Sequence, residues 1–280
     1  MRIEELMRPN LKDEYGILKL QNIILNIMKY IHELCEQHNI EYYVIGGTAL
    51  GSVRHGGFIP WDDDLDIAMT RENYEKFIAV CDRELDTDNF YLQVGRRDWL
   101  LYFSKLRLKG TLFDEEGAGE EIAKEKRGIF VDIFPLDKAS NNRIVRAWQY
   151  FCSKLLIANA LSERKQSYRS NNALKRFMMI AAFPLKCTAI RNCLYRQVTM
   201  CNKKDTHYIG DFFEITRLKD ASYPMSLWGK PQKTIFERTE LYGPEKMKEY
   251  LAWYFGDYMQ LPPVEKRVCG HHSNLDFGKY

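Results

Sequence analysis

The sequence lacks long apolar runs, and it lacks the regular cysteine spacing that is typical of disulfide-rich secreted domains. Its longest apolar run, Phe177–Leu185, is far shorter than the roughly 20 residues that cross a bilayer as a helix. Its seven cysteines are odd in number, and residues 1–14 lack the apolar core of a signal peptide. We therefore expect free thiols in a reducing cytoplasm and no membrane-spanning helix. One alternative stays open, a zinc site formed by Cys187, Cys193, Cys201 and His207.

The sequence also has little excess of one charge, since its net charge is only +3 over 280 residues. The charge is nevertheless unevenly distributed, because the segment from Arg143 to Lys204 contains 13 Lys or Arg residues and one acid, Glu163. Two interpretations of this basic segment remain open: a solvated helical face, or a face that contacts an anionic membrane or a lipid-linked anionic substrate. No nucleic-acid motif accompanies it, so we expect no nucleic-acid partner.

Hydrophobic periodicity predicts a mixed arrangement of helices and strands. Helices are predicted at 11–39, 48–53, 71–85 and 244–255, with Thr70 as the N-cap of the third. Strands are predicted at 41–45, 65–69, 90–94, 100–108 and 128–134, with a β-like region at 234–241. After Pro135 the pattern changes to helix through about residue 205. We therefore predict a mixed core at 1–140, a basic helical segment at 141–210 and a C-terminal segment at 211–280 that folds back on the core.

Four carboxylates lie within five positions of one another, at Asp62, Asp63, Asp64 and Asp66. Like charges at this density repel, and burying them is costly unless a cation compensates. If residues 64–69 are extended, Asp64 and Asp66 share one face of a strand, and the apolar residues between them enter the core. Two such carboxylates can bind a hard divalent cation, with Mg²⁺ as the first candidate and Mn²⁺ as the second. The alternative is an acidic turn that stays hydrated or caps a helix.

A further acid, Asp132, lies within the run GIFVDIFPLD, which is otherwise apolar on both faces and is typical of a central strand. An ionised aspartate at such a position needs a partner. Two partners remain open: a Lys or Arg side chain, or a metal ion shared with Asp64 and Asp66. A set of three carboxylates on neighbouring strands is suited to phosphoryl transfer.

Residues 46–48, Gly-Gly-Thr, follow the predicted strand at 41–45 and precede a short helix. Glycines let the backbone approach a phosphate closely, and the N–H groups at the start of a helix can bind it. Arg54 and His55 follow in the next loop, where they are candidates to contact phosphate oxygens or an acceptor. In the tail, Arg267, His271 and His272 provide either a second cationic contact or a solvated chain end.

The stretch GGTALGSVRHGGFIPWDDDLDIAM, followed by RGIFVDIFPLD, resembles the LicD family of phosphotransferases in the nucleotidyltransferase-fold superfamily. The superfamily pattern is a Gly-Gly turn, an Asp-x-Asp pair on the next strand and a third Asp on a later strand. Here the pattern falls on Gly46, Gly47 and Thr48, on Asp64 and Asp66, and on Asp132, while Asp62 fits a further family acid. The close resemblance covers about residues 42–70 and 127–137, and the tail YFGDYMQLPPVEKRVCGHH resembles the family's C-terminal region more weakly.

The resemblance implies an α+β fold with a mixed sheet flanked by helices, and transfer of phosphocholine from CDP-choline to a sugar hydroxyl with release of CMP. The acceptor would be a cell-surface glycan such as lipopolysaccharide or teichoic acid, and an acceptor linked to lipid at the inner face of the cytoplasmic membrane is one form that stays open. Relatives move other phospho-alditols, so the head group stays open. Two alternatives also stay open: a nucleotidyltransferase that uses a nucleoside triphosphate, and an inactive nucleotide- or sugar-binding module.

Overall fold

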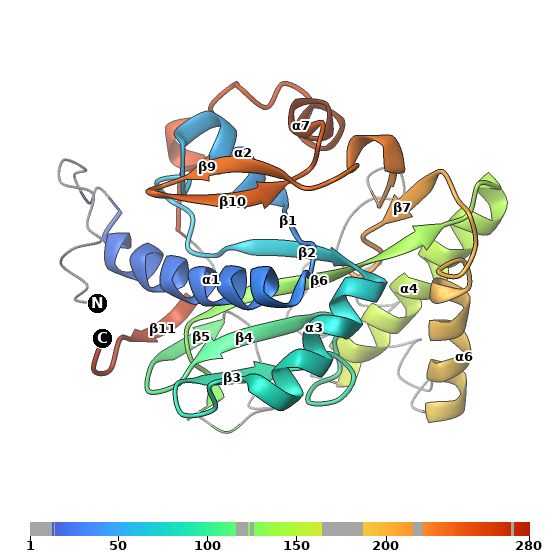
Figure 1. Cartoon of the computed structure of the whole chain (residues 1–280), viewed down its shortest axis with the longest axis horizontal. Coiled ribbons are helices and arrows are strands. Elements are labelled where there is room, and N and C mark those ends of the chain that lie inside the picture. The colour runs from blue at the N-terminus through green and yellow to red at the C-terminus, as the bar shows by residue number, and fades with distance from the viewer. Residues whose placement is uncertain are drawn as a thin grey trace.

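The centre of the molecule is a mixed β-sheet with helices packed against it, which confirms the predicted α+β class (Figure 1). The structure is a computed structural model that describes residues 13, 15–115, 123, 126–163, 187–214, 221–269 and 272–280. The main sheet has the strand order β1 (Tyr43–Val44), β2 (Asp66–Thr70), β6 (Phe130–Ala139), β4 (Ser104–Leu108) and β3 (Phe90–Gln93). Strands β2 and β6 are parallel, and the other neighbours in this order are antiparallel.

Strand β6 is longer than predicted, because it continues through Pro135 to Ala139 instead of ending at 134. The N–H of Asp132 donates to the carbonyl of Leu65, the residue before β2. Because the backbone groups of a strand alternate in direction, those of residues 133 and 135 point away from β2. On that side β6 pairs with β4 up to Ile133 and with β7 (Tyr208–Gly210) from Asp137 onward. Pro135 therefore lies in the gap between two partner strands, where its missing N–H costs no ladder hydrogen bond.

Helices α1 (Leu18–His38) and α3 (Arg71–Glu84) pack on one face of the sheet (Figure 1). Helix α3 begins as predicted, with the Thr70 hydroxyl accepting a hydrogen bond from the N–H of Asn73. Helix α1 begins at Leu18 rather than at 11, because the Asp13 carboxylate accepts hydrogen bonds from the N–H groups of Ile17 and Leu18. An acidic side chain that accepts from the first amides stabilises a helix start at this point.

At the β1 edge, a second group of elements covers helix α2 (Gly46–His55). It consists of a hairpin of β9 (Gln232–Phe236) and β10 (Thr239–Gly243), followed by α7 (Met247–Phe255). Figure 1 shows this C-terminal part above the sheet, beside the α2 helix that comes from the N-terminal half of the chain. The hairpin and α7 agree with the predicted β-like region and helix, although the helix starts at 247 instead of 244.

Helices α4 (Arg143–Glu163) and α6 (Thr188–Thr199) pack together at the far end of β6, around a separate small apolar cluster. Strand β8 (Ser222–Pro224) pairs with β7, and β5 (Leu112–Glu115) pairs with β11 (His272–Asp276). Short 3₁₀ turns lie at Met225–Leu227 and Val264–Lys266. Residues 164–186, which hold the longest apolar run and much of the basic segment, lie outside the described residues. In the described part of the chain, no helix has the length and hydrophobicity to cross a bilayer.

Candidate active site

The predicted acids meet where the parallel strands β2 and β6 run side by side. Asp66 is the first residue of β2, and its register partner on β6 is Asp132. Register partners on adjacent strands point to the same face of a sheet, and Asp64 lies two residues before Asp66 on the same chain. The structure therefore brings together the two strands on which the sequence placed Asp64, Asp66 and Asp132.

These acids lie on the sheet face opposite α1 and α3. On β4, Lys105 is the register partner of Asp132, whereas the neighbouring Ser104 is the partner of Ile133. The Ser104 hydroxyl lies 2.5 Å from the Tyr74 hydroxyl of α3, so Ser104 and Ile133 face the helices. Because side chains alternate along a strand, Lys105 and Asp132 face the other way.

Asp132 is paired with a lysine, one of the two partners that the sequence left open. The ammonium of Lys105 lies 2.7 Å from Oδ1 and 3.0 Å from Oδ2 of Asp132, and 3.0 Å from Oε1 of Glu115. Arg107 lies 3.2 Å from the other oxygen of Glu115. Burial raises the pKa of Asp132 to about 6 against the opposing effect of Lys105. Burial also opposes ionisation of Glu115, but Lys105 and Arg107 outweigh it and lower that pKa to about 2.

Asp66 has no such compensation, because its carboxylate makes no hydrogen bond or ion pair with the described residues. Burial raises the pKa of Asp66 well above its usual value, and the nearby charges of Asp64, Asp132, Asp62 and Glu214 raise it further. Several carboxylates thus gather around the half-buried Asp66. A bound cation would favour the ionised form of a carboxylate in these surroundings.

The donor chemistry of this site fits a hard divalent cation, since its candidate ligands are carboxylate oxygens. Asp64 and Asp66 are the residues that would hold it. Across the described ranges, no three His, Cys, Asp or Glu side chains converge in a geometry ready for a metal ion. Lys105 explains why Asp132 does not take part in a metal-ready arrangement, because the lysine contacts both oxygens of that carboxylate. The three-acid ligand set therefore stays a prediction.

The Gly-Gly-Thr motif forms the first turn of α2, directly beside the acids. Gly46 has φ +52° and donates its N–H to the Tyr250 hydroxyl at 3.0 Å. A Cβ on Gly47 would lie 2.8 Å from Oδ2 of Asp62, which only glycine avoids. The Thr48 hydroxyl accepts the N–H of Asp66 at 2.9 Å, so this side chain ties α2 to β2. The first-turn amides of a helix have no partner within the helix and are suited to bind phosphate oxygens.

Arg54 and His55 lie at the opposite end of α2, eight and nine residues beyond Gly46 and so about 12 Å along the helix axis. Arg54 donates to Nε2 of His55 at 3.0 Å and to the carbonyl of Tyr258 at 2.9 Å. Arg267 donates to the carbonyl of Pro262 and lies over the Trp61 ring at 5.4 Å. Arg54, Trp61 and Tyr258 line part of a cavity of about 450 Å³ between α2 and the tail. His271 lies outside the described residues.

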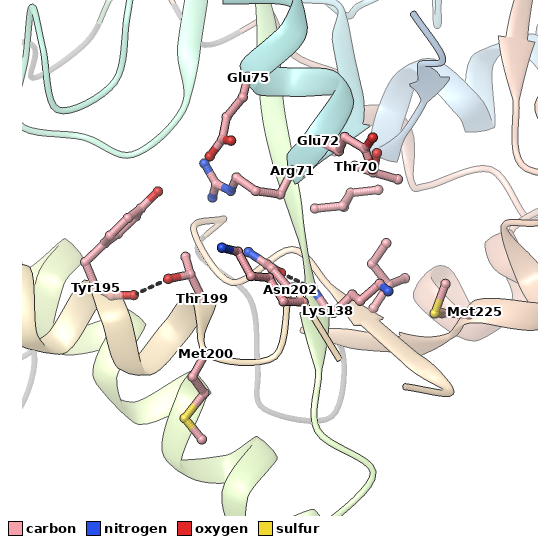
Figure 2. A pocket seen from close by; sticks show the side chains of 13 residues that line it. Thr70, Arg71, Glu72, Glu75, Lys138, Tyr195, Thr199, Met200, Asn202 and Met225 are labelled. Atoms are coloured by element: carbon pink, nitrogen blue, oxygen red, sulfur yellow. Dashed lines mark hydrogen bonds between the residues drawn. The ribbon is translucent and has the colours of Figure 1, made fainter. Parts of the chain in front are cut away.

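A larger cavity, of about 700 Å³, lies at the other end of β2 and β6, between α3 and α6 (Figure 2). In its wall Arg71 makes a bidentate pair with Asp137, at 2.9 and 2.8 Å, and Asn202 donates to the same carboxylate at 2.6 Å. Figure 2 shows Tyr195 and Thr199 of α6 opposite Arg71 of α3. No local sequence signal marks this cavity, because its walls come from separate segments that range from Thr70 to Met225.

The structure also places near Asp66 residues that the sequence analysis missed. Glu214 is one of the acids whose charge adds to the effect of burial on the pKa of Asp66, and Tyr250 accepts the N–H of Gly46 at the start of α2. One sequence feature could have indicated the role of Lys105: in SKLRL, cations alternate with apolar residues, and all five residues lie on a buried strand. The candidate zinc ligands are not gathered: Cys187 and Cys193 are exposed, Cys201 is buried, and the described residues hold no such cluster.

Residues 39–156 match the model of the LicD/FKTN/FKRP nucleotidyltransferase domain. Over 264 residues, the chain is 28% identical to the lipopolysaccharide cholinephosphotransferase LicD of Haemophilus influenzae, covering 90% of this chain and 94% of that protein. It is 38% identical over 45 residues to the human ribitol 5-phosphate transferase FKRP, which is 16% of this chain and 9% of that protein. An uncharacterised protein of Rickettsia typhi is 50% identical over 57 residues, 20% of this chain and 18% of that protein.

Proposed function

The chain belongs to the LicD family through its nucleotidyltransferase domain, and from this premise we propose that it is a phosphotransferase that modifies a cell-surface glycan. The proposed donor is CDP-choline, or a CDP-linked alditol, and the proposed acceptor is a sugar hydroxyl of lipopolysaccharide or teichoic acid. The observation that carries the proposal is the Asp66 carboxylate, which has no ion pair with the described residues and is the register partner of Asp132, beside the first turn of α2. The names of two relatives, a cholinephosphotransferase and a ribitol 5-phosphate transferase, support the class of group transferred.

In the proposed reaction, a new P–O bond forms between the sugar oxygen and the phosphorus that carries the head group. The bond from that phosphorus to the bridging oxygen breaks, CMP leaves, and the sugar hydroxyl loses its proton. Mg²⁺ (or Mn²⁺) bound by Asp64 and Asp66 would supply charge neutralisation of the diphosphate. The amides of Gly47 and Thr48 would bind phosphate oxygens at the start of α2.

Asp132 is the proposed base for the acceptor proton. Its pKa of about 6 leaves it largely ionised near neutral pH and able to take up a proton. Lys105 holds the carboxylate at two oxygens and would keep it in one orientation. Asp62 shapes the glycine turn, whereas Arg54, His55, Arg267 and His271 are proposed contacts for the remote part of donor or acceptor.

We place the reaction at the cytoplasmic face of the membrane, where a lipid-linked acceptor would be presented. Ile144, Trp148 and Phe151 of α4 are exposed large apolar side chains within the basic segment. Aromatic and basic side chains on one helix favour contact with an anionic lipid surface. This contact is proposed as peripheral.

The experiment that tests the function is a donor panel. The protein is incubated with Mg²⁺, a glycan acceptor and CDP-choline, CDP-ribitol, CDP-glycerol or CTP, and products are analysed by mass spectrometry. We expect CMP together with a glycan that has gained a phospho-linked head group. Release of diphosphate from CTP would instead identify a nucleotidyltransferase, and nucleotide binding without any product would identify an inactive binding module.

A further inference from the structure

A second group of acidic and aromatic side chains lies next to Asp66. Asp211 and Glu214 follow β7, and Tyr250 and Tyr254 lie one turn apart on α7. The Tyr223 ring of β8 completes the group. Its centroid is 5.6 Å from that of Tyr250 and 6.4 Å from that of Tyr254, and the two α7 rings are 6.2 Å apart.

Within the described residues, the acids of this group form no ion pair with a lysine or arginine. Lys154 donates to the carbonyl oxygens of Phe212 at 3.1 Å and Glu214 at 2.6 Å, rather than to a carboxylate. Glu214 accepts a hydrogen bond from the Tyr254 hydroxyl at 2.7 Å. Burial raises the pKa of both Asp211 and Glu214.

Asp211 carries an independent sign of a missing partner. Its side chain is only 2% exposed, and Oδ1 accepts the N–H of Glu214 at 3.3 Å. Oδ2 is buried and has no hydrogen-bond partner within the described chain. Burying a carboxylate oxygen without a donor costs free energy, so a positive group close to this atom would stabilise it.

The surroundings distinguish between two kinds of cation. A metal ion would require several converging oxygen ligands, whereas this group combines two carboxylates with three tyrosine rings. Carboxylates together with aromatic rings are the environment that binds organic ammonium groups, and quaternary ammonium above all. Glu214 and Tyr254 are partly exposed and accessible to a ligand, while Asp211, Tyr223 and Tyr250 form the buried base.

We propose that Glu214, Tyr254 and the buried residues behind them bind the ammonium end of the donor head group, and that they select choline over neutral alditols. The inference rests on the proposed function, whose transfer centre is Asp66. Tyr250 connects the two, because its hydroxyl accepts the N–H of Gly46 in the turn assigned to the donor phosphates. In phosphocholine a two-carbon spacer separates the phosphate ester oxygen from the nitrogen, so the ammonium group must bind close to the phosphate.

The test compares CDP-choline with its neutral isostere, CDP-3,3-dimethylbutanol, in which carbon replaces the nitrogen. We expect wild-type protein to prefer CDP-choline in kcat/KM by about tenfold or more, because only the charged head group interacts electrostatically with the acids and rings. Glu214→Gln should reduce this preference to near unity. Tyr254→Leu should reduce it more than Tyr254→Phe, which keeps the ring. Trp253→Leu, a change of an exposed aromatic on the same helix, is the matched control and should keep the full preference.

Calorimetric titration with choline chloride gives a second measurement that does not require turnover. Wild-type protein should bind choline, and Glu214→Gln, shown to be folded by its unfolding transition, should bind it at least several-fold more weakly. Equal use of the two donors by wild-type protein, or an unchanged preference in Glu214→Gln, would overturn the inference while leaving the transferase function in place. If neither donor is used, the proposed function fails, and unaltered choline binding by Glu214→Gln then refutes the inference separately.

Discussion

The parallel strands β2 and β6 have an acidic residue at each end, Asp137 and Asp66, and the two differ in how their charge is balanced. At the far end, Asp137 receives two hydrogen bonds from Arg71 and one from Asn202, and it is fully buried. At the near end, Asp66 is surrounded by further carboxylates and has no ion pair with the described residues. The same strand pair thus carries one carboxylate that is paired within the protein, Asp137, and one that has no ion pair with the described residues, Asp66.

This difference separates a structural role from a functional one. A buried carboxylate whose partners are all protein groups contributes to the folded state and needs no ligand. A buried carboxylate next to other acids lowers the stability of the protein alone and gains partners when a cation and a substrate bind. We therefore expect substitutions at the two ends to have opposite effects on stability and activity.

The largest expected effect is on activity at the near end. Asp64→Asn should lower the rate of CMP release by about 10³-fold or more, since a carboxylate that holds the charge-neutralising cation contributes several kcal/mol to the transition state. Initial rates with CDP-choline and Mg²⁺ measure this. Glu75→Gln, an exposed acid of α3 beside the far cavity, is the control and should retain the wild-type rate. Comparable losses in both variants would remove the distinction between the two ends.

The next effect is on stability at the far end. Asp137→Leu should lower the free energy of unfolding by about 3 kcal/mol or more, because it leaves the guanidinium of Arg71 buried without its partner. Denaturant unfolding measures the change. The double variant Arg71→Met, Asp137→Leu should recover much of the loss, since it removes both charges together. If the single variant were as stable as the wild type, Asp137 would not be a structural charge.

A smaller effect is expected where α2 joins β2. Thr48→Val should lower the free energy of unfolding by about 1–3 kcal/mol, because the N–H of Asp66 loses its acceptor. Thr48→Ser keeps the hydroxyl and should stay closer to the wild type. Equal stability of the valine and serine variants would show that this hydrogen bond does not hold the turn against the strand.

The smallest effect on stability is expected on α4. Replacing the exposed side chains of Trp148 and Phe151 by serine should change the free energy of unfolding by about 0.5 kcal/mol or less. The same variant should bind vesicles of phosphatidylglycerol and phosphatidylcholine several-fold more weakly at low salt. Co-sedimentation measures this, and equal binding by the wild type and the variant would exclude α4 as the lipid-binding surface.

The sequence predicts this molecule best where the signal is local. Alternation around Asp66 places its strand correctly to within one residue, and the Thr70 cap fixes the start of α3. It predicts poorly what depends on distant neighbours. Pro135 does not end β6 because β4 stops before it and β7 starts after it, and neither fact is visible at Pro135. Strand β7 has only three residues, too few to show an alternation of apolar and polar side chains.

The candidate site shows the same limit. The acids and the glycine turn are adjacent in sequence or carried by regular strands, so their grouping can be predicted. The partner of Asp132 cannot be predicted in this way, because either a lysine or a metal satisfies a buried carboxylate. Only the register of β4 brings Lys105 opposite it. Arg54 is close to the acids in sequence, but the length of α2 carries it away from them and toward the tail.

The most direct test of the account is the behaviour of Asp66→Asn. Its free energy of unfolding and its rate of CMP release from CDP-choline, with Mg²⁺ and a glycan acceptor, are measured on the same preparation. We predict a protein at least as stable as the wild type, because one repelling charge is removed, with no detectable transfer of phosphocholine. An Asp66→Asn protein that transfers phosphocholine at the wild-type rate would show that the reaction does not take place at this group of acids.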